Sequence, residues 1–212
     1  MNSSEQRKTA SAGAASPFAT FEMSDVHALI ADYPLAWVLV PGTDGMTASQ
    51  LPLIGEYDRD GRLTGLIGHL ARANPLADQL ASARCATILF SGPGNYVSPA
   101  HAGRRDWAPT WNHAHLKIAV DVEISASLTE TSLDMLVEAM ERGRADPWTA
   151  SEIADRYQGM VKAIIGFRAT VTAIEGRFKL GQDERPDTLH SILASHADTE
   201  LTRWMRRFNE AR

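Results

Sequence analysis

The chain is poor in cysteine: Cys85 is the only one among 212 residues. A single cysteine excludes an internal disulfide framework. It lies in the apolar run CATILF, a setting that favours a buried, unreactive thiol. Long apolar runs are also missing, since no stretch approaches the roughly 20 residues that cross a bilayer, and the N-terminus lacks the apolar centre of a secretory signal. These absences predict a cytoplasmic protein without a membrane segment.

Positive charge is scarce as well. The formal net charge is −5 and the sequence pI is about 5.8, whereas nucleic-acid-binding domains usually carry a basic footprint. A local basic patch stays open near the C-terminus, at Arg203, Arg206, Arg207 and Arg212. The favoured interpretation of this stretch is an amphipathic helix that packs four apolar residues inward: Leu201, Trp204, Met205 and Phe208. DNA contact therefore has only weak support.

The remaining residues predict one domain preceded by a tail. Residues 1–16 are rich in Ser, Ala and Gly and read as a flexible tail, and residues 17–212 form the domain. Short apolar runs separated by turn residues predict six strands, at residues 35–40, 46–54, 63–69, 84–92, 110–124 and 164–180. Gly92-Pro93-Gly94 reads as a turn, and Phe167, Ala169, Val171 and Ala173 are expected to share one face. Because the turns are tight, the strands are expected to be antiparallel, which with the helices gives an α+β barrel.

Capping residues predict where the helices begin. Ser24 is expected to cap a short helix that runs through Tyr33, and Asn74 to cap one with Pro75 at its first position. Another helix should start at Thr129, with an apolar stripe at Leu133, Leu136, Val137 and Met140. Three further starts are expected at the capping box Thr149–Glu152, at Pro186 and at Thr199.

The segment GHLARANPLADQL carries the clearest chemistry. A strand ends near His69, Arg72 lies in the loop, and a helix begins at Asn74-Pro75. The first N–H groups of a helix are unpaired and attract anions, and an arginine adds a planar cationic fork. The sequence thus predicts a phosphate site, while plain helix capping with a surface-paired Arg72 accounts for the same residues equally well.

A second segment, DWAPTWNHAHL, combines flat aromatic and short polar side chains. Trp107, Trp111, Thr110 and Asn112 would suit an aromatic ring bordered by hydrogen-bonding atoms, although packed core tryptophans would look the same. His113 and His115 share a strand face, but no third ligand stands at a metal-binding spacing. The chain also contains no nucleophile elbow, HExxH or paired helical carboxylates, so any chemistry must come from a cofactor.

Four motifs together resemble a known family. GHLARANP, GPGNYVSP, APTWNHAH and EGRFKLGQD occur in the order found in PaiB-type FMN-binding negative transcriptional regulators. The resemblance covers the chain from about Pro17 to its C-terminus. It implies a six-stranded antiparallel split barrel related to pyridoxamine phosphate oxidases, working as a homodimer with FMN between its subunits. What it implies for function is a flavin-binding regulator.

The same resemblance implies cofactor-binding residues. The segment Ala71–Asn74 matches the phosphate-binding stretch that follows the third strand, so Arg72 and Asn74 are expected to bind the phosphate, with His69 nearby. Seven further positions match flavin-facing or motif residues of the family: Ser49, Gln50, Thr110, Trp111, Asn112, and the pair Lys179 and Gln182 in KLGQD.

The chain departs from the family pattern at several positions. SPAHA replaces a Ser-Pro-Ser-Trp-Tyr stretch, Gln50 stands for a common histidine, and KLGQD has Gly181 and Asp183 where the family has serine and asparagine. A carboxylate close to a phosphate is unfavourable, so these changes predict weaker flavin binding or an altered ligand. Two other hypotheses therefore stay open: a flavin-dependent oxidoreductase acting on a small molecule, and a structural or ligand-binding dimer without cofactor.

Overall fold

The computed structural model describes residues 16–42 and 45–210, except the side chain of Asp155. Most of the predicted tail, residues 1–15, lies outside this range. The elements run in the order η1 (Pro17–Ala19), α1 (Met23–Asp32), β1 (Leu35–Gly42), β2 (Gly45–Tyr57), β3 (Leu63–Ala71), α2 (Pro75–Ala83), β4 (Cys85–Val97), β5 (Thr110–Ser125), α3 (Leu128–Glu141), η2 (Ala150–Ile153), α4 (Ala154–Lys162), β6 (Ile164–Lys179), α5 (Pro186–Ser195) and α6 (Thr199–Arg207).

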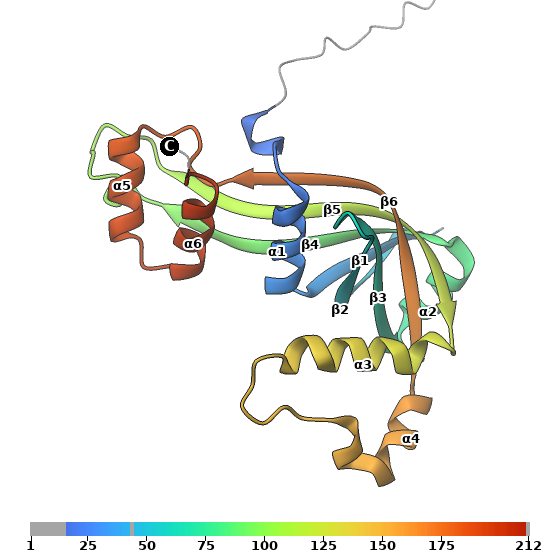
Figure 1. The fold of residues 1–212 in the computed structure, drawn as a ribbon. Coiled ribbons are helices and arrows are strands. Elements are labelled where there is room, and N and C mark those ends of the chain that lie inside the picture. Colours follow the sequence, from blue (N-terminus) through green and yellow to red (C-terminus); the bar gives the residue numbers. More distant parts are fainter. Residues whose placement is uncertain (1–15, 43–44, 211–212) are drawn as a thin grey trace, which may run out of the picture.

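The six strands form one antiparallel barrel (Figure 1). Their spatial order is β1-β2-β3-β6-β5-β4, and β1 pairs with β4 as well as with β2. The predicted fold class, a six-stranded antiparallel split barrel with peripheral helices, is confirmed. β4, β5 and β6 extend past the barrel and carry α5 and α6 at their far end, while α3 and α4 lie at the opposite side (Figure 1).

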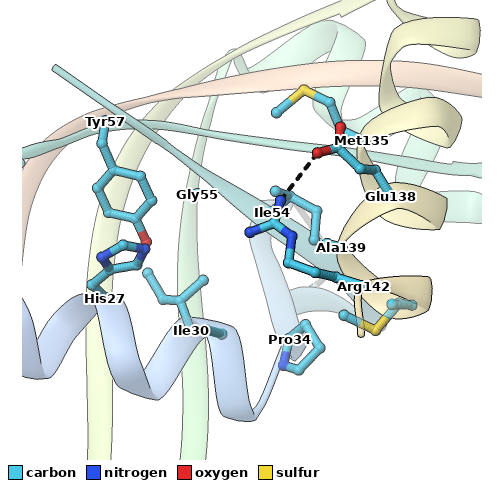
Figure 2. A pocket seen from close by; sticks show the side chains of 12 residues that line it. His27, Ile30, Pro34, Ile54, Gly55, Tyr57, Met135, Glu138, Ala139 and Arg142 are labelled. Atoms are coloured by element: carbon cyan, nitrogen blue, oxygen red, sulfur yellow. Dashed lines mark hydrogen bonds and ion pairs between the residues drawn. The ribbon is translucent and has the colours of Figure 1, made fainter. Parts of the chain in front are cut away.

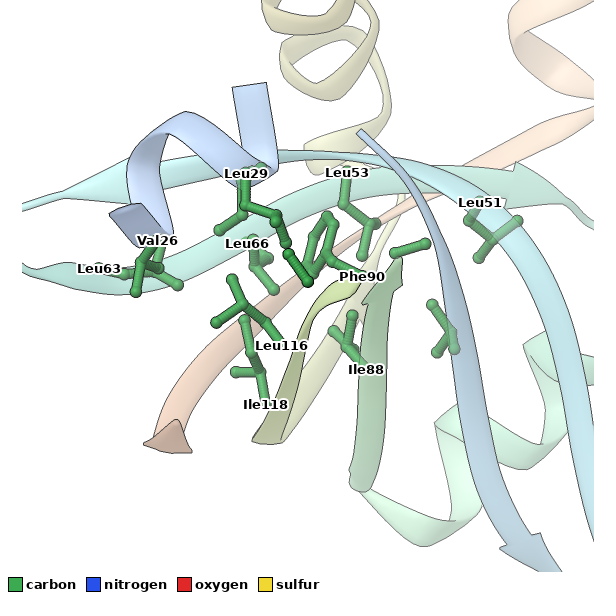
Figure 3. Packing of buried hydrophobic residues seen from close by; sticks show 14 of the residues in the cluster. Val26, Leu29, Leu51, Leu53, Leu63, Leu66, Ile88, Phe90, Leu116 and Ile118 are labelled. Carbon is green, nitrogen blue, oxygen red and sulfur yellow. The ribbon is translucent and has the colours of Figure 1, made fainter. Parts of the chain in front are cut away.

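The core follows from strand alternation, because successive side chains on a strand point to opposite faces. Ile88 and Phe90 of β4 face inward with Leu116 of β5, and Leu29 of α1 closes the barrel from one side (Figure 3). The same alternation turns Cys85 outward, since Ala86 after it is buried. The expectation of a buried thiol is therefore wrong: Cys85 is exposed.

Two strands differ from their predicted course at bulges. Gly92-Pro93-Gly94 does not form a turn, because β4 continues to Val97 and takes up the irregularity as a register shift between Ser91 and Gly94. A bulge leaves a residue outside the ladder, so a proline without an N–H group is tolerated there. A second shift, between Ala119 and Val120, leaves Ala173 exposed while Phe167 and Ala169 are buried.

Helix starts are mostly where the sequence places them, but the cap of α1 and the buried face of α3 differ from the prediction. α1 begins at Met23 with Glu22 as its cap, because Glu22 and Asp25 form a reciprocal capping box that displaces the predicted cap Ser24. In α3 the predicted apolar stripe is not the buried face. Thr129 and Ser132 are buried instead, since the N–H group of Gly166 in β6 donates to the hydroxyl of Thr129.

The C-terminal helix packs as the sequence predicts. Leu201, Trp204 and Met205 are fully buried, and Phe208 packs against the same cluster. Two of its arginines form ion pairs with α1 and within α6: Arg207 pairs with Asp25 at 2.8 Å, and Arg203 pairs with Asp32 and Glu200. Among the described residues, no helix is long and apolar enough to cross a membrane.

Candidate functional site

The start of α2 is built as predicted, but its N–H groups are already occupied. The Asn74 side chain accepts a hydrogen bond from the Leu76 N–H at 2.9 Å, and its carbonyl accepts from the Ala77 N–H at 2.9 Å. Pro75 has no N–H to offer. The expected row of unpaired helix donors is therefore wrong for this helix, and an anion here would have to bind through side chains.

Side chains for that purpose surround the cap. The hydroxyl of Ser49 on β2 lies 3.2 Å from the Asn74 side-chain oxygen. Arg72 is exposed, its Nε donates to the Lys162 carbonyl at 3.1 Å, and its backbone N–H donates to the Ala163 carbonyl. These contacts fix the guanidinium beside the end of α4. Among the described residues none forms a hydrogen bond with the two Nη groups of Arg72, so both can donate to a ligand.

A second group of predicted residues lies where β5 and β6 leave the barrel. The Lys179 ammonium donates a hydrogen bond to the Thr110 hydroxyl. Trp111 points outward, is 59% exposed, and meets the Tyr96 ring edge-on at 6.2 Å. Asn112 points the other way, is 2% exposed, and donates to the sulfur of Met205. Asn112 therefore holds α6, whereas the other three residues form an open surface.

Gln182 has a structural task in the turn after β6. Its side chain accepts from the Leu180 N–H at 2.7 Å and donates to the Phe178 carbonyl at 2.6 Å. Gly181 beside it adopts φ +89, a left-handed conformation that favours glycine over the family's serine.

The last two predicted residues lie apart from both groups. His69 faces α3, with its Nδ1 3.5 Å from the Ser132 hydroxyl, and burial lowers its pKa. Gln50 is exposed on the outer face of β2, opposite Trp37 of β1. Gln50 therefore lies on the same outer face as an exposed aromatic side chain, while His69 is directed elsewhere.

One chain does not bring the two groups together. Ser49 pairs with Val38, which pairs with Ile88, which pairs with Ile118. Thr110 lies eight residues before Ile118 on β5, which at about 3.3 Å per residue is roughly 26 Å along the strand. The Arg72 group and the Thr110 group are thus at separate places on the molecule.

A cavity of about 550 Å³ lies between α1, β2 and α3 (Figure 2). His27 and Tyr57 lie at one end, with ring centroids 4.3 Å apart, and the ion pair of Glu138 with Arg142 lies at the other. Burial raises the pKa of Tyr57 to about 12, so its hydroxyl stays protonated. None of the predicted cofactor residues lines this cavity.

The metal interpretation of the two strand histidines gains no support. His113 and His115 stack with ring centroids 5.5 Å apart, and the described part of the chain holds no group of three metal-ligating side chains. Sequence reasoning missed their other neighbour: Arg177 lies opposite His115 on β6. The signal was present in EGRFKL, because a strand period of two puts Arg177 and Lys179 on one face.

The chain matches a family of known proteins over most of its length. The family described as "Putative FMN-binding domain" matches residues 14–173, about three quarters of the chain. Lys179 and Gln182 lie beyond that match. The protease synthase and sporulation protein PAI 2 of Bacillus subtilis is 27% identical over 152 residues, covering 69% of this chain and 70% of the relative.

Solved structures share the fold at low identity. The FAD and heme binding protein of Mycobacterium smegmatis aligns with a TM-score of 0.56 and 16% identity, covering 84% of this chain and 80% of that protein. The flavocytochrome Anf3 of Azotobacter vinelandii aligns with a TM-score of 0.54 and 14% identity, covering 76% and 69%.

The donor groups of this chain suit FMN. A flavin phosphate needs a cation and neutral donors, which the Arg72 guanidinium and the side-chain amide N–H groups of Asn74 offer, and the Ser49 hydroxyl, which donates to the Asn74 oxygen here, would turn to join them. A flavin ring needs a flat apolar surface with polar atoms at its border, which Trp111 and Thr110 offer. From the family match, the shared fold and these donors, we conclude that the chain belongs to the PaiB-type family of FMN-binding split barrels and that its cofactor is FMN.

Proposed function

We propose that FMN lies between two copies of the chain. Arg72, Ser49 and Asn74 of one subunit would hold the phosphate, and Thr110, Trp111 and Lys179 of the partner would border the ring. The separation of these two groups within one chain carries the proposal, because a single copy leaves each group as half a site. Gln50, on the outer face of β2, would lie beside the ring.

The outer face of the barrel supports a homodimer. Leu35, Trp37 and Met46 are 53%, 43% and 63% exposed on neighbouring strands, and Trp37 lies between Gln50 and Leu89. Large apolar side chains that are exposed together on one face of a sheet are typical of an interaction surface. We infer that two copies pair through this face and through the stretch Trp107–His115.

The role that we propose is regulation through the flavin, in the cytoplasm. The Bacillus subtilis relative is named for protease synthase and sporulation, which supports a regulatory role. Direct recognition of DNA has little support, because Arg203 and Arg207 are already paired with carboxylates. Any DNA contact should be non-specific and lost between about 50 and 200 mM salt; a footprint on a defined operator at physiological salt would contradict this.

A flavin-dependent oxidoreductase is the alternative. It is favoured by the exposure of Trp111, which leaves an open flat surface at the proposed ring position. Bound FMN would supply hydride or electron transfer, and the chain would contribute binding and orientation. Steady turnover of FMN with a small-molecule donor would favour this alternative, whereas its absence in flavin-loaded protein would favour the regulator.

The phosphate assignment is tested by titrating FMN against the Arg72→Ala variant. Loss of a charge-assisted pair should weaken binding at least tenfold, or about 1.4 kcal/mol. Arg59→Ala, in the exposed turn between β2 and β3, is the matched control and should bind like the original protein. Equal affinities for all three would refute the assignment.

Mixed dimers test whether the site is shared. Arg72→Ala and Lys179→Ala should each bind FMN weakly alone. When their subunits are mixed, a shared site predicts that each heterodimer regains one intact site, made of Arg72 from one chain and Lys179 from the other. A site built within one chain would regain none, so a mixture that binds no better than its parents would contradict the proposal, as would a 23.1 kDa monomer in sedimentation.

A further inference from the structure

Four basic side chains form a compact block on the outer face of β5 and β6. His113 lies opposite Lys179, and His115 lies opposite Arg177, the next pair along the same face. The two imidazoles stack with ring planes 8° apart. Four groups that can carry positive charge thus occupy two adjacent cross-strand pairs.

The block is not neutralised by acidic neighbours. Burial, followed by the charges of the neighbouring basic groups, lowers the pKa of His113, and burial and then Arg177 lower that of His115. Within the described residues, no carboxylate forms an ion pair with Arg177 or Lys179. The next cross-strand pair on this face differs, because its lysine, Lys117, forms an ion pair with Glu175 at 3.2 Å. Because both histidine pKa values are lowered, the imidazoles are mainly neutral near pH 7 and offer N–H donors, while Arg177 and Lys179 carry the positive charge. In a chain of net charge −5, this combination favours an anion.

Aromatic surface borders the block on two sides. The Phe18 ring lies 5.3 Å from the guanidinium carbon of Arg177 and 5.9 Å from the ammonium of Lys179. Trp111, two residues before His113 on the same strand face, is largely exposed. The surface therefore joins a flat apolar platform to a cluster of cationic donors, which is complementary to an aromatic compound with an anionic substituent.

We propose that His113, His115 and Arg177, with Lys179 at the border, bind the carboxylate or phosphate of a small aromatic molecule distinct from FMN. The proposal rests on the proposed function in one respect, which is that the flavin phosphate binds at Arg72. The aromatic ring would lie against the Phe18 ring, because Trp111 borders the flavin in the proposed function. A reaction partner or an effector bound there would be next to the flavin and could respond to the redox state of the cofactor.

Calorimetric titration of FMN-loaded protein with phenyl phosphate tests the proposal, with benzyl alcohol as the uncharged counterpart. Phenyl phosphate should bind and benzyl alcohol should not. Arg177→Gln should weaken phenyl phosphate at least tenfold while FMN affinity stays within twofold. Lys117→Gln is the matched control, because this lysine lies on the same strand face but is paired with Glu175; it should bind phenyl phosphate normally.

Each alternative has its own signature. The proposal is wrong if phenyl phosphate binds Arg177→Gln as tightly as it binds the original protein. It is also wrong if phenyl phosphate binds neither protein, a result that would follow if a carboxylate of the partner subunit already occupies the block. If Arg177→Gln loses FMN in parallel, the block belongs to the flavin site and a second ligand is excluded. Failure of the proposed function differs from all of these, since FMN would then bind independently of Arg72 while phenyl phosphate still bound the FMN-free protein.

Discussion

At the scale of single residues, Gly166 permits the closest approach between a helix and the barrel. A Cβ atom at this position would lie 2.4 Å from the carbonyl carbon of Leu128, in the turn that opens α3. Gly166→Ala should therefore force the backbones apart and lower the free energy of unfolding by roughly 1–3 kcal/mol. Urea unfolding measures this.

The control for that change lies in α4. A Cβ atom at Gly159 would meet nothing within 4 Å, so Gly159→Ala should raise stability by up to about 1 kcal/mol through helix propensity. If both variants were equally stable, the close contact at Gly166 would not limit the packing of α3.

The roles of single residues were predictable from the sequence where those roles depend on residues nearby in the chain. Asn74 with Pro75, and Thr149 with Glu152, cap helices as their spacing indicates, because a cap depends on neighbours within a few positions. The exposure of Cys85 was not predicted, since it depends on which face of β4 meets the core. The occupied N–H groups at α2 show that a good cap and an open anion site compete for the same donors.

At the scale of elements, one of the two ion pairs between α1 and α6 involves a buried carboxylate. Asp25 is 9% exposed and pairs with Arg207 at 2.8 Å. Arg207→Gln should lower the free energy of unfolding by about 1–3 kcal/mol, because it removes the cationic partner of a largely desolvated carboxylate, which then keeps its hydrogen bond from the Glu22 N–H. Arg206→Gln should change it by less than about 0.5 kcal/mol, as expected for an exposed side chain that forms no ion pair with the described residues and donates to the Leu193 carbonyl. Similar losses of unfolding free energy in both variants would show that the ion pair of Asp25 with Arg207 contributes no more to stability than the exposed Arg206 does.

Strands were predicted well because alternation is a property of each strand alone. Bulges were not, since the shift near Ala119 depends on how β5 pairs with β6. The same limit applies to the candidate site: motifs suggested which residues to expect at a flavin site, but their placement in two distant groups follows from pairing between strands far apart in sequence. Arg177 was missed for this reason, because its partner His115 is 62 positions away along the chain.

At the scale of the whole molecule, buried histidines should make stability depend on pH. Burial lowers the pKa of His69 below its ordinary 6.5, so the unfolded chain takes up a proton at this position more readily than the folded one. This contribution to stability is present above pH 6.5 and is lost as the pH falls below it. Unfolding midpoints at pH 7.5 and 5.0 should differ less in His69→Gln than in the original protein; an unchanged difference would assign the effect to other groups.

The ladder that joins β1 to β4 in the barrel is short. β1 pairs with β2 at eight positions but with β4 at only three, from Trp37 with Leu89 to Leu39 with Thr87. Such a ladder is where amide protons should exchange soonest, because few hydrogen bonds must break together for it to open. Trp37, one of the exposed apolar residues through which we expect two copies to pair, lies in this ladder. A partner subunit would then stabilise the β1–β4 ladder from outside. Diluting the protein would therefore dissociate the dimer and also make the barrel open more readily.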